Sequence, residues 1–339
     1  MDTSTLIATA QALVAPGKGI LAADESSPTI TKRFSALGIE STADSRRDYR
    51  ELLLTSPALP ETVGGVILYD ETLRQSTAGG TPFPELLAGL GVTPGIKVDT
   101  GAKPLAACPD ETVTEGLDGL RERLAEYRAL GAGFAKWRAV IAIGEDRPSA
   151  TCLEANAHAL ARYAALCQEA GIVPIVEPEV LMEGGHTIER CFEVTKTALQ
   201  TVFAQLALQR VVLEGIILKP NMVLPGAQSP DRVTVEAVAE ATLRCLTETV
   251  PAEVPGIAFL SGGQSPELAT AHLNAMNARG PAPWRLTYSF GRALQDPALK
   301  AWGGKPANAD AVQLALTHRL HLTAAASQGR YTPEMEAAA

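Results

Sequence analysis

The sequence predicts an α/β fold of the (β/α)8 TIM barrel type. Eight short apolar stretches, each followed by a helical pattern, recur at intervals of about 30–45 residues, as expected for a barrel of strand–helix units. Polar residues gather at the C-terminal ends of these stretches, where such barrels carry their active sites. An open, doubly wound sheet is the alternative, but no strand–turn–helix segment carries the Gly-x-Gly-x-x-Gly fingerprint.

The composition is that of one globular unit. The chain has 339 residues, of which 46% are hydrophobic and 20% are charged, which is ordinary for a globular protein. No linker or change in composition interrupts it. We therefore expect a single barrel domain over residues 1–339, with a C-terminal tail from about residue 329 to 339.

Charge and cysteine usage exclude several classes of function. The net charge of −9 argues against a nucleic-acid partner or an anionic membrane surface, so any bound phosphate must meet a local cluster of cations. No apolar run approaches the roughly 18 residues of a membrane span, and the N-terminus is unlike a signal peptide. The five cysteines are scattered without a Cys-x-x-Cys pair. We expect a cytoplasmic protein with reduced thiols.

Each expected strand is a short apolar run closed by a glycine, a proline or a charged residue. The run that leads to Lys219, for example, is stopped by Pro220 and Asn221 after a handful of residues, which is too soon for a helix. In order, the expected strands cover residues 19–25, 63–70, 94–99, 132–140, 172–179, 215–219, 255–263 and 285–290.

The expected helices have apolar residues at three- and four-residue spacing. Pro16 and Gly17 stop the first helix, and Gly38 and Gly171 follow two of the later ones, as is common at helix C-termini. In order, the expected helices cover residues 3–14, 29–37, 43–54, 84–90, 116–130, 151–170, 188–209, 234–249 and 266–278, with one or two more between 310 and 327.

Lys219 is the central candidate for catalysis. As the last residue of a buried strand, it has its stem in the core and its amine at the barrel rim. Burial disfavours the ammonium form, which biases the amine toward the neutral nucleophile. Taken alone, the same lysine could instead extend to solvent from a strand end.

Paired charges on neighbouring strands favour the catalytic interpretation. The period of two along a strand places Lys136 with Arg138, and Glu177 with Glu179, on the interior side. A buried ion-pair network is the alternative. The residue types nevertheless suit a lysine that attacks a ketone. Lys136 supplies a nearby cation, and Glu177 or Glu179 can move protons as a carbinolamine loses water.

Asp24 completes this set of candidate groups. It lies at the end of another expected strand, where it could take the proton from a substrate hydroxyl. An iminium then acts as the electron sink for breaking or forming a carbon–carbon bond without a metal. The histidines lie in expected helices or loops rather than at strand ends, so we expect no metal site and no cofactor.

Two features indicate phosphate binding. Ser261, Gly262 and Gly263 lie at the end of the seventh expected strand, and Gly291 and Arg292 follow the eighth, at the usual phosphate site of this barrel. Glycine N–H groups can approach an anion closely, and arginine supplies the charge.

A second cationic corner is expected near the first and third strands. Arg33 and Lys97 lie near Ser26 in this arrangement and could hold a phosphate at the other end of a substrate.

Eight motifs together resemble one known family, class I (Schiff-base) fructose-1,6-bisphosphate aldolase. The similarity runs in order from about residue 17 to residue 333. The motifs are GILAADES (19–26), GGVILYDETL (64–73), GIKVD (95–99), FAKWR (134–138), GIVPIVEPE (171–179), LKPNMV (218–223), FLSGGQS (259–265) and FGRALQ (290–295).

The resemblance implies roles for the catalytic candidates. Lys219 would form the Schiff base, and Glu177 would be the main acid/base group. Glu179 and Lys136 would assist around the carbinolamine, and Asp24 would handle the C4 hydroxyl.

The resemblance also implies two phosphate-binding ends. The C1-phosphate would lie at the residues after the last two strands, namely Ser261, Gly262, Gly263, Gly291 and Arg292. The C6-phosphate end would be lined by hydroxyl and cationic residues, namely Ser26, Thr29, Arg33, Lys97 and Arg138.

The implied activity is that of a glycolytic and gluconeogenic lyase. It would cleave fructose 1,6-bisphosphate reversibly to dihydroxyacetone phosphate and glyceraldehyde 3-phosphate, as a cytoplasmic homotetramer without metal. A Schiff-base aldolase that prefers fructose 1-phosphate, or a non-catalytic scaffold, are the alternatives.

The sequence departs from the family pattern at three places. Animal members end in a tyrosine that assists proton exchange, whereas this sequence ends in alanines, so Tyr331 or a carboxylate would substitute, or the step would be slower. Phe290 replaces a tyrosine, and Thr29 replaces a serine but keeps the hydroxyl.

Overall fold

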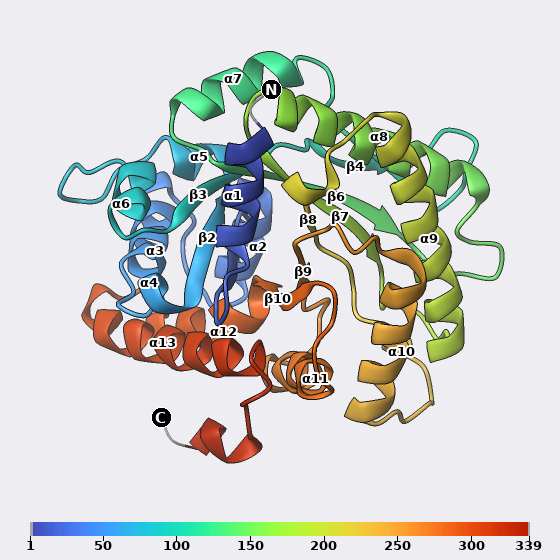
Figure 1. The fold of residues 1–339 in the computed structure, drawn as a ribbon. Helices are drawn as coiled ribbons and strands as arrows, with labels where there is room; N and C mark the ends of the chain where they lie inside the picture. Colours follow the sequence, from blue (N-terminus) through green and yellow to red (C-terminus); the bar gives the residue numbers. More distant parts are fainter. Residues whose placement is uncertain (1–2, 338–339) are drawn as a thin grey trace.

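Eight parallel strands close into a barrel in the computed structural model, which describes residues 3–337 (Figure 1). The strand order around the barrel is β1-β10-β9-β8-β7-β6-β3-β2, and β1 pairs with both β2 and β10, so no edge is left open. The predicted fold class is therefore confirmed. The strands are β1 Gly19–Ala23, β2 Val63–Leu68, β3 Thr93–Lys97, β6 Phe134–Ile141, β7 Val173–Val180, β8 Ile217–Leu218, β9 Gly256–Phe259 and β10 Arg285–Phe290.

Helices form the layer outside the barrel. Several begin at a Ser or Thr whose side chain accepts a hydrogen bond from the backbone three residues on, including Ser149, Thr187, Thr234 and Ser265. The helices are α1 Thr3–Leu13, α2 Ser27–Ser35, α3 Ala43–Leu54, α4 Leu59–Thr62, α5 Asp70–Leu73, α6 Phe83–Gly89, α7 Leu120–Ala129, α8 Ala150–Glu169, α9 Ile188–Leu208, α10 Val235–Thr249, α11 Pro266–Ala278, α12 Arg292–Trp302 and α13 Ala309–Ala326.

Helix α1 closes the N-terminal mouth of the barrel. Its Leu6 and Leu13 are buried in one cluster with the interior strand residues Ile20, Phe134 and Ile175. This apolar layer fills the lower half of the barrel and excludes water from that end. The polar groups of the interior are thereby left to the opposite, C-terminal half.

Phe134 fits this interior because two neighbouring strands carry glycine. A Cβ on Gly65 would lie 2.6 Å from the Phe134 ring, and one on Gly95 would lie 2.3 Å from it. A side chain at either position would collide with the ring. The glycines therefore serve packing inside the barrel.

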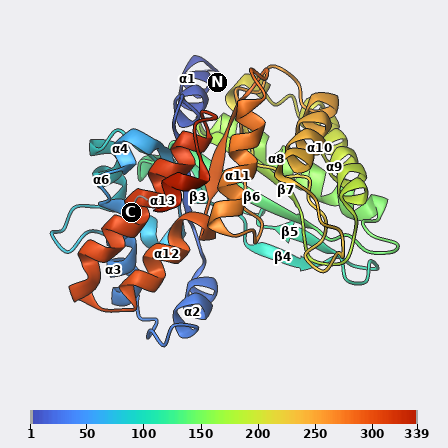
Figure 2. The same ribbon diagram turned by 90° about the horizontal axis from the view of Figure 1, so that it is seen from below.

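The two ends of the barrel are built differently. Figure 2 shows α1 at one end, and α2 with the β4–β5 hairpin at the other. The hairpin pairs β4 Gly101–Pro104 with β5 Thr112–Glu115 in antiparallel fashion. It follows β3, so the C-terminal ends of the strands have a rim raised by the hairpin and α2 (Figure 2).

Several local features differ from the sequence prediction. The β4–β5 hairpin and helix α12 were not predicted, and residues 116–119 lie outside α7 because Gly116 and Gly119 have positive φ angles of 127° and 64°. The sixth barrel strand is also shorter than predicted. Gly215 belongs instead to the 3-10 turn η1 Leu213–Gly215, and β8 contains two residues.

The C-terminal segment returns to the outside of α11 and α13. After η2 Pro306–Asn308 and α13, it ends in η3 Pro333–Ala337, and residues 338–339 of the predicted tail lie outside the described range. Glu336 in η3 forms an ion pair with Arg319 of α13. Tyr331 is buried against this layer.

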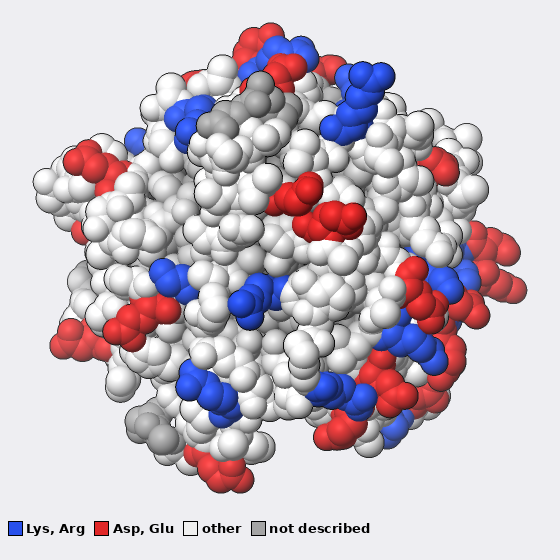
Figure 3. All heavy atoms as spheres, viewed as in Figure 1, with Lys and Arg blue, Asp and Glu red and all other residues white. Residues whose placement is uncertain are grey.

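The surface around α1 carries charges of both signs. In Figure 3, which views the molecule from this end, blue and red side chains are interspersed among uncharged ones, both near the centre of the face and at its edge. Among the described residues, no helix is long and apolar enough to cross a membrane. The five cysteines are unpaired, and four of them are buried.

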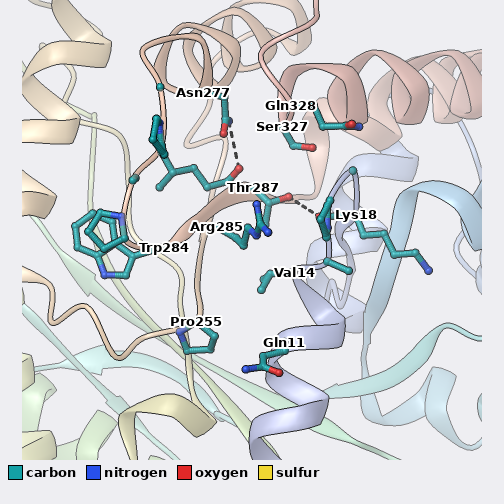
Figure 4. Close-up of a pocket in the computed structure, with 18 residues that line it drawn as sticks. Gln11, Val14, Lys18, Pro255, Asn277, Trp284, Arg285, Thr287, Ser327 and Gln328 are labelled. Carbon is teal, nitrogen blue, oxygen red and sulfur yellow. Dashed lines mark hydrogen bonds between the residues drawn. The ribbon is translucent and has the colours of Figure 1, made fainter.

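A cavity also lies at this N-terminal mouth. It has a volume of about 790 Å³ and is lined by residues of α1, α11 and the loops before β1 and β10, among them Lys18, Trp284 and Arg285 (Figure 4). It does not include Lys219 or any of the other predicted site residues. The predicted site residues lie at the opposite end, where the strand C-termini present polar side chains.

Candidate active site

Lys219 lies at the C-terminal end of β8 with its amine inside the barrel. Its backbone N–H donates to the Val176 carbonyl at 2.8 Å, which fixes it beside β7. The residue is 4% exposed, and its Nζ lies 3.2 Å from Glu177 Oε1. The sequence left open a lysine that extends to solvent, and the structure contradicts that alternative.

Lys136 connects two carboxylates from other strands. Its Nζ lies 2.7 Å from Asp24 Oδ2 and 3.5 Å from Glu177 Oε2. Asp24 follows β1, Lys136 is in β6, and Glu177 is in β7. Together with Lys219, these side chains form one cluster of two acids and two amines at the strand C-termini.

The ionisation states within this cluster follow from mutual charge. Burial alone would raise the pKa of Asp24, but the positive charges of Lys136 and Lys219 outweigh it and bring that pKa to about 2. Burial would lower the pKa of Lys136, but Asp24, Glu177 and Asp99 raise it well above its usual value. At neutral pH, Asp24 is therefore a carboxylate and Lys136 is an ammonium group.

Glu177, rather than Glu179, is the acid that contacts the lysines. Glu179 accepts a hydrogen bond from Arg138 Nε and lies one alternation further along β7. Burial opposes the charge on Arg138, but the pairing with Glu179 raises the pKa of its guanidinium above the usual range. The sequence left the choice between the two acids open, and these contacts favour Glu177.

A turn with left-handed backbone follows β9. Gly262 and Gly263 have φ angles of +56° and +84°, which glycine adopts readily. Ser261 is buried, and its carbonyl accepts the Gln264 N–H at 3.0 Å, which closes the turn. We call residues 261–264 the glycine turn.

Arg292 lies beside the glycine turn. A Cβ built on Gly263 would lie 3.6 Å from Arg292 Nη2, and Arg292 is the first residue of α12. Its side chain is exposed and, within residues 3–337, has neither an ion pair nor a hydrogen-bond partner. Gly291 precedes it and offers no capping side chain, so the first N–H groups of α12 are available to an anion.

The second predicted corner contains cations that are already paired. Lys97 Nζ lies 2.5 Å from Asp99 Oδ1 and 2.8 Å from the Asp99 carbonyl oxygen. Arg33 pairs with Glu25 and also lies 2.7 Å from Asp296 Oδ1. The two corners thus differ in charge balance.

Two hydroxyl groups border this corner. Ser26 is the N-cap of α2, and its Oγ lies 3.0 Å from Thr29 Oγ1. Asp70, which also ends a predicted strand, is not part of the site. It starts α5, and its half-exposed carboxylate pairs with Arg74.

The lysine segment and the glycine turn are joined directly. The Leu260 N–H donates to the Pro220 carbonyl at 3.1 Å. Because Pro220 follows Lys219 and Leu260 precedes Ser261, this bond sets the distance between the amine and the glycine turn. Among residues 3–337, no group of three or more His, Cys, Asp and Glu side chains is arranged to hold a metal ion.

Comparison with known proteins agrees with this geometry. Residues 5–339 match the family model described as fructose-bisphosphate aldolase class-I. The chain belongs to the class I fructose-bisphosphate aldolase family.

Individual relatives support the same assignment. A probable fructose-bisphosphate aldolase class 1 from Xanthomonas campestris pv. campestris is 62% identical over 302 residues, covering 89% of this chain and 90% of the relative. The cytosolic fructose-bisphosphate aldolase 4 of Arabidopsis thaliana is 51% identical over 97% of this chain and 84% of the relative.

A solved structure shares the fold closely. Fructose-bisphosphate aldolase from Plasmodium falciparum, crystallised with TRAP and a small-molecule inhibitor, has a TM-score of 0.96 and 46% sequence identity. The match covers 97% of this chain and 95% of the other. The resemblance seen in the motifs is thus confirmed over nearly the whole chain.

Sequence reasoning missed one buried pair in this aldolase-family chain. His272 of α11 is 3% exposed, and its Nδ1 lies 2.6 Å from Gln264 Oε1 of the glycine turn. A signal was present, because His272 is spaced with Ala269, Leu273 and Met276 on the buried face of α11. A titratable residue on that apolar face requires a polar partner.

Sequence reasoning also did not identify Ser289 as a buried polar residue of the barrel. It is 1% exposed, and its Oγ is the only side-chain oxygen of β10 without a hydrogen-bond partner in the described chain. By alternation it shares a side of β10 with Thr287.

Phe290 and Tyr331, two positions at which the sequence differs from the family pattern or could compensate for a difference, both lie outside the lysine cluster. Phe290 is fully buried and packs against Tyr288, with ring centroids 5.8 Å apart. Tyr331 lies on the outer side of α11, where its N–H donates to Asn274 and its hydroxyl donates to Glu336 at 2.9 Å. Burial and the Glu336 charge raise the pKa of Tyr331 to about 12. In this arrangement, Tyr331 is outside the lysine cluster.

Proposed function

We propose that this chain cleaves fructose 1,6-bisphosphate reversibly to dihydroxyacetone phosphate and glyceraldehyde 3-phosphate through a Schiff base on Lys219. The observation that carries the proposal is the buried Lys219 amine 3.2 Å from Glu177, with Lys136 and Asp24 next to them. A structural ion-pair network would not require an unpaired cation beside it. The unpaired Arg292 beside the glycine turn supplies that cation.

The first half of the reaction forms the imine. Glu177 first takes a proton from the Lys219 ammonium group and gives it to the substrate oxygen as the neutral amine attacks the C2 carbonyl, so that a C–N bond forms while the carbonyl electrons move to oxygen. Glu177 is the nearest base to take the amine proton and the nearest acid to protonate the leaving hydroxyl. Loss of water then leaves an iminium at C2.

The second half breaks the carbon–carbon bond. Asp24 takes the proton of the C4 hydroxyl, the C3–C4 bond breaks, and its electron pair neutralises the iminium as an enamine. Glyceraldehyde 3-phosphate departs. Because Lys136 makes Asp24 a weak base, proton uptake proceeds together with C–C cleavage, which makes the hydroxyl more acidic.

The proton that Asp24 took from the C4 hydroxyl is given to C3 of the enamine, which restores the iminium. Water then adds to C2 and releases dihydroxyacetone phosphate and the Lys219 ammonium group. The groups next to Lys219 are then back in their starting states. Glu179 holds Arg138 in place at the edge of this site and does not contact the lysines. We assign Glu179 an assisting role and Glu177 the main one.

The two phosphates would bind at the two corners. The C1-phosphate is placed at Ser261, Gly262, Gly263, Gly291 and Arg292, where N–H groups and a free guanidinium meet. The C6-phosphate is placed among Ser26, Thr29, Arg33, Lys97 and Arg138. There each cation must exchange a carboxylate partner for the phosphate.

This asymmetry makes fructose 1-phosphate the second substrate to test. The paired C6 corner gains less from a phosphate than the unpaired C1 corner, because the carboxylates already neutralise its cations. The family assignment nevertheless favours the bisphosphate as the main substrate. The ratio of kcat/KM for the two sugars measures the contribution of the C6 corner.

A turnover assay of the purified chain tests the proposal. We expect cleavage of fructose 1,6-bisphosphate at an undiminished rate in the presence of a metal chelator. Absence of turnover would support a non-catalytic scaffold, and loss of activity in chelator would support a metal-dependent mechanism.

We further propose a cytoplasmic homotetramer, as the family resemblance implies. Light scattering on the eluted protein checks the mass against four chains. Fractionation of the source cells checks the location.

A further inference from the structure

A series of hydrogen bonds with a fixed direction lies behind the proposed C1-phosphate corner. It runs from His272 through the Gln264 side chain to the Ser261 carbonyl of the glycine turn. Gln264 Nε2 lies 2.9 Å from the Ser261 carbonyl oxygen and 3.6 Å from Met222 Sδ. On its other side, Gln264 Oε1 lies 2.6 Å from His272 Nδ1. All three residues of the series are less than a tenth exposed, so water does not compete for these bonds.

The direction of each bond is determined by chemistry. A carbonyl oxygen can only accept, so the Gln264 nitrogen must face Ser261, and its amide oxygen must face His272. That oxygen accepts only, so His272 Nδ1 carries the proton. Burial lowers the pKa of His272 to about 4, and the negative charge of Glu236 raises it only partly. The imidazole is therefore neutral at pH 7 and protonated at Nδ1.

The peptide between Ser261 and Gly262 transmits this constraint to the phosphate corner. The Ser261 carbonyl and the Gly262 N–H belong to one planar trans unit and point in opposite directions. A carbonyl held toward Gln264 therefore aims the Gly262 N–H away from the core. The Ser261 carbonyl also accepts the Gln264 backbone N–H, and the side-chain bond is a second constraint on a turn whose two successive glycines can adopt many other backbone conformations.

We propose that His272 is a positioning residue for the C1-phosphate corner, which acts through Gln264 to fix the direction of the Gly262 N–H. The inference rests on the proposed function, because it assigns the glycine turn to the C1-phosphate. His272 itself does not touch substrate. Its effect is on the affinity for the phosphate group, which is bound in the same way before and during the chemical steps.

Two variants break the series of hydrogen bonds at different points. His272→Leu removes the Nδ1 donor, and Gln264→Met keeps the length of the side chain but loses both polar atoms. We expect each to weaken binding of inorganic phosphate about tenfold, as measured by titration calorimetry. We expect a similar rise in the KM for fructose 1-phosphate with little change in kcat, because the lost interaction is uniform in ground and transition states.

A conservative variant separates hydrogen bonding from packing. In His272→Asn, the amide nitrogen is the same number of bonds from Cα as His Nδ1, so it can donate to Gln264. We expect His272→Asn to restore phosphate affinity to within about twofold of the wild type. Asn277→Leu is the matched control, because Asn277 is on the same helix but bonds the Leu286 carbonyl at 3.2 Å, away from the glycine turn.

The outcomes distinguish this inference from the proposed function. Unchanged phosphate binding in both His272→Leu and Gln264→Met would overturn the role of His272. The role would also be overturned if His272→Asn bound phosphate as weakly as His272→Leu. An equal loss in Asn277→Leu would assign the effect to general destabilisation and would also overturn it. If the wild type cleaves neither sugar phosphate, the proposed function fails, and the calorimetric titration still decides the role of His272. Should His272→Leu fail to fold, Gln264→Met and His272→Asn carry the same comparison.

Discussion

Lys136 Nζ lies 2.7 Å from Asp24 Oδ2, and this contact joins β6 to the end of β1 across the barrel interior. The contact keeps Asp24 ionised, since its pKa falls to about 2, and keeps Lys136 charged. A second, longer contact connects Lys136 to Glu177. The ammonium group thus separates the two carboxylates that the proposed mechanism uses for different bonds.

Asp24→Asn should separate imine formation from cleavage. The amide keeps the shape of Asp24 but cannot accept the C4-hydroxyl proton, so we expect cleavage of fructose 1,6-bisphosphate to fall by about 10²–10⁴-fold. Imine formation with dihydroxyacetone phosphate does not use this proton. Borohydride trapping of that ketone should therefore continue, and a variant that loses both steps equally would contradict the separate role of Asp24.

Arg292→Ala should weaken the binding of fructose 1-phosphate and of the bisphosphate to the same extent. Its unpaired guanidinium is placed at the C1-phosphate, which fructose 1-phosphate and the bisphosphate share. We expect both KM values to rise by about 10–100-fold, the range for a lost charge-assisted hydrogen bond.

Arg285→Ala is the matched control for that substitution. Arg285 is also exposed and has no ion-pair partner within residues 3–337, but it lines the cavity at the opposite mouth of the barrel (Figure 4). We expect its kinetics to match the wild type. Equal losses in the two variants would indicate a general effect of charge rather than a phosphate contact.

Asp296→Asn should sharpen the preference for the bisphosphate. Asp296 Oδ1 lies 2.7 Å from Arg33, and removing its charge leaves the guanidinium less neutralised for a C6-phosphate. Because the carboxylate is 39% exposed, we expect an increase of at most about fivefold in the kcat/KM ratio of bisphosphate to fructose 1-phosphate. Glu248→Gln, which breaks a surface pair with Lys196, should leave the ratio unchanged. A fall in the ratio for Asp296→Asn would place the C6-phosphate away from Arg33.

The lowered pKa of His272 should make the stability of the fold depend on pH. Its pKa is about 4 in the folded chain, compared with 6.5 for an ordinary histidine. Between these values the unfolded chain binds more protons, so stability is lost as the pH falls from 6.5 toward 4, by about 3 kcal/mol. His272→Asn lacks this contribution. Thermal unfolding at pH 7 and pH 4.5 should show a smaller loss of Tm in the variant, and an equal loss would contradict a neutral buried imidazole.

Much of this architecture could be predicted from the residues because their patterns are local. The strand near Lys219 is delimited by Pro220, and the pairs Lys136 with Arg138 and Glu177 with Glu179 follow the period of two. Each lies at a strand end, and the barrel brings strand ends together. Lys219 and Glu177 could therefore be placed near one another from the sequence, whereas the distance between them could not.

The parts that sequence reasoning missed depend on contacts distant in the chain. The β4–β5 hairpin is short and exposed, so it lacks an apolar pattern. Helix α12 contains Pro297 in its interior, which argues against a helix when read locally, and the helix forms because one face is buried, including Leu294, Leu299 and Trp302. The pairing of Arg33 with Asp296 also depended on tertiary structure, since the two residues are distant in the chain.

The most direct test of the account is covalent trapping of the substrate ketone. Wild-type protein is reduced with borohydride in the presence of dihydroxyacetone phosphate, and the adduct is located by peptide mass spectrometry, with Lys219→Ala and Lys136→Ala treated in parallel. We expect one modified residue, Lys219, in the wild type, no adduct in Lys219→Ala, and an adduct still on Lys219 in Lys136→Ala. An adduct on Lys136, or undiminished labelling of the Lys219→Ala protein, would contradict the proposal that Lys219 forms the Schiff base.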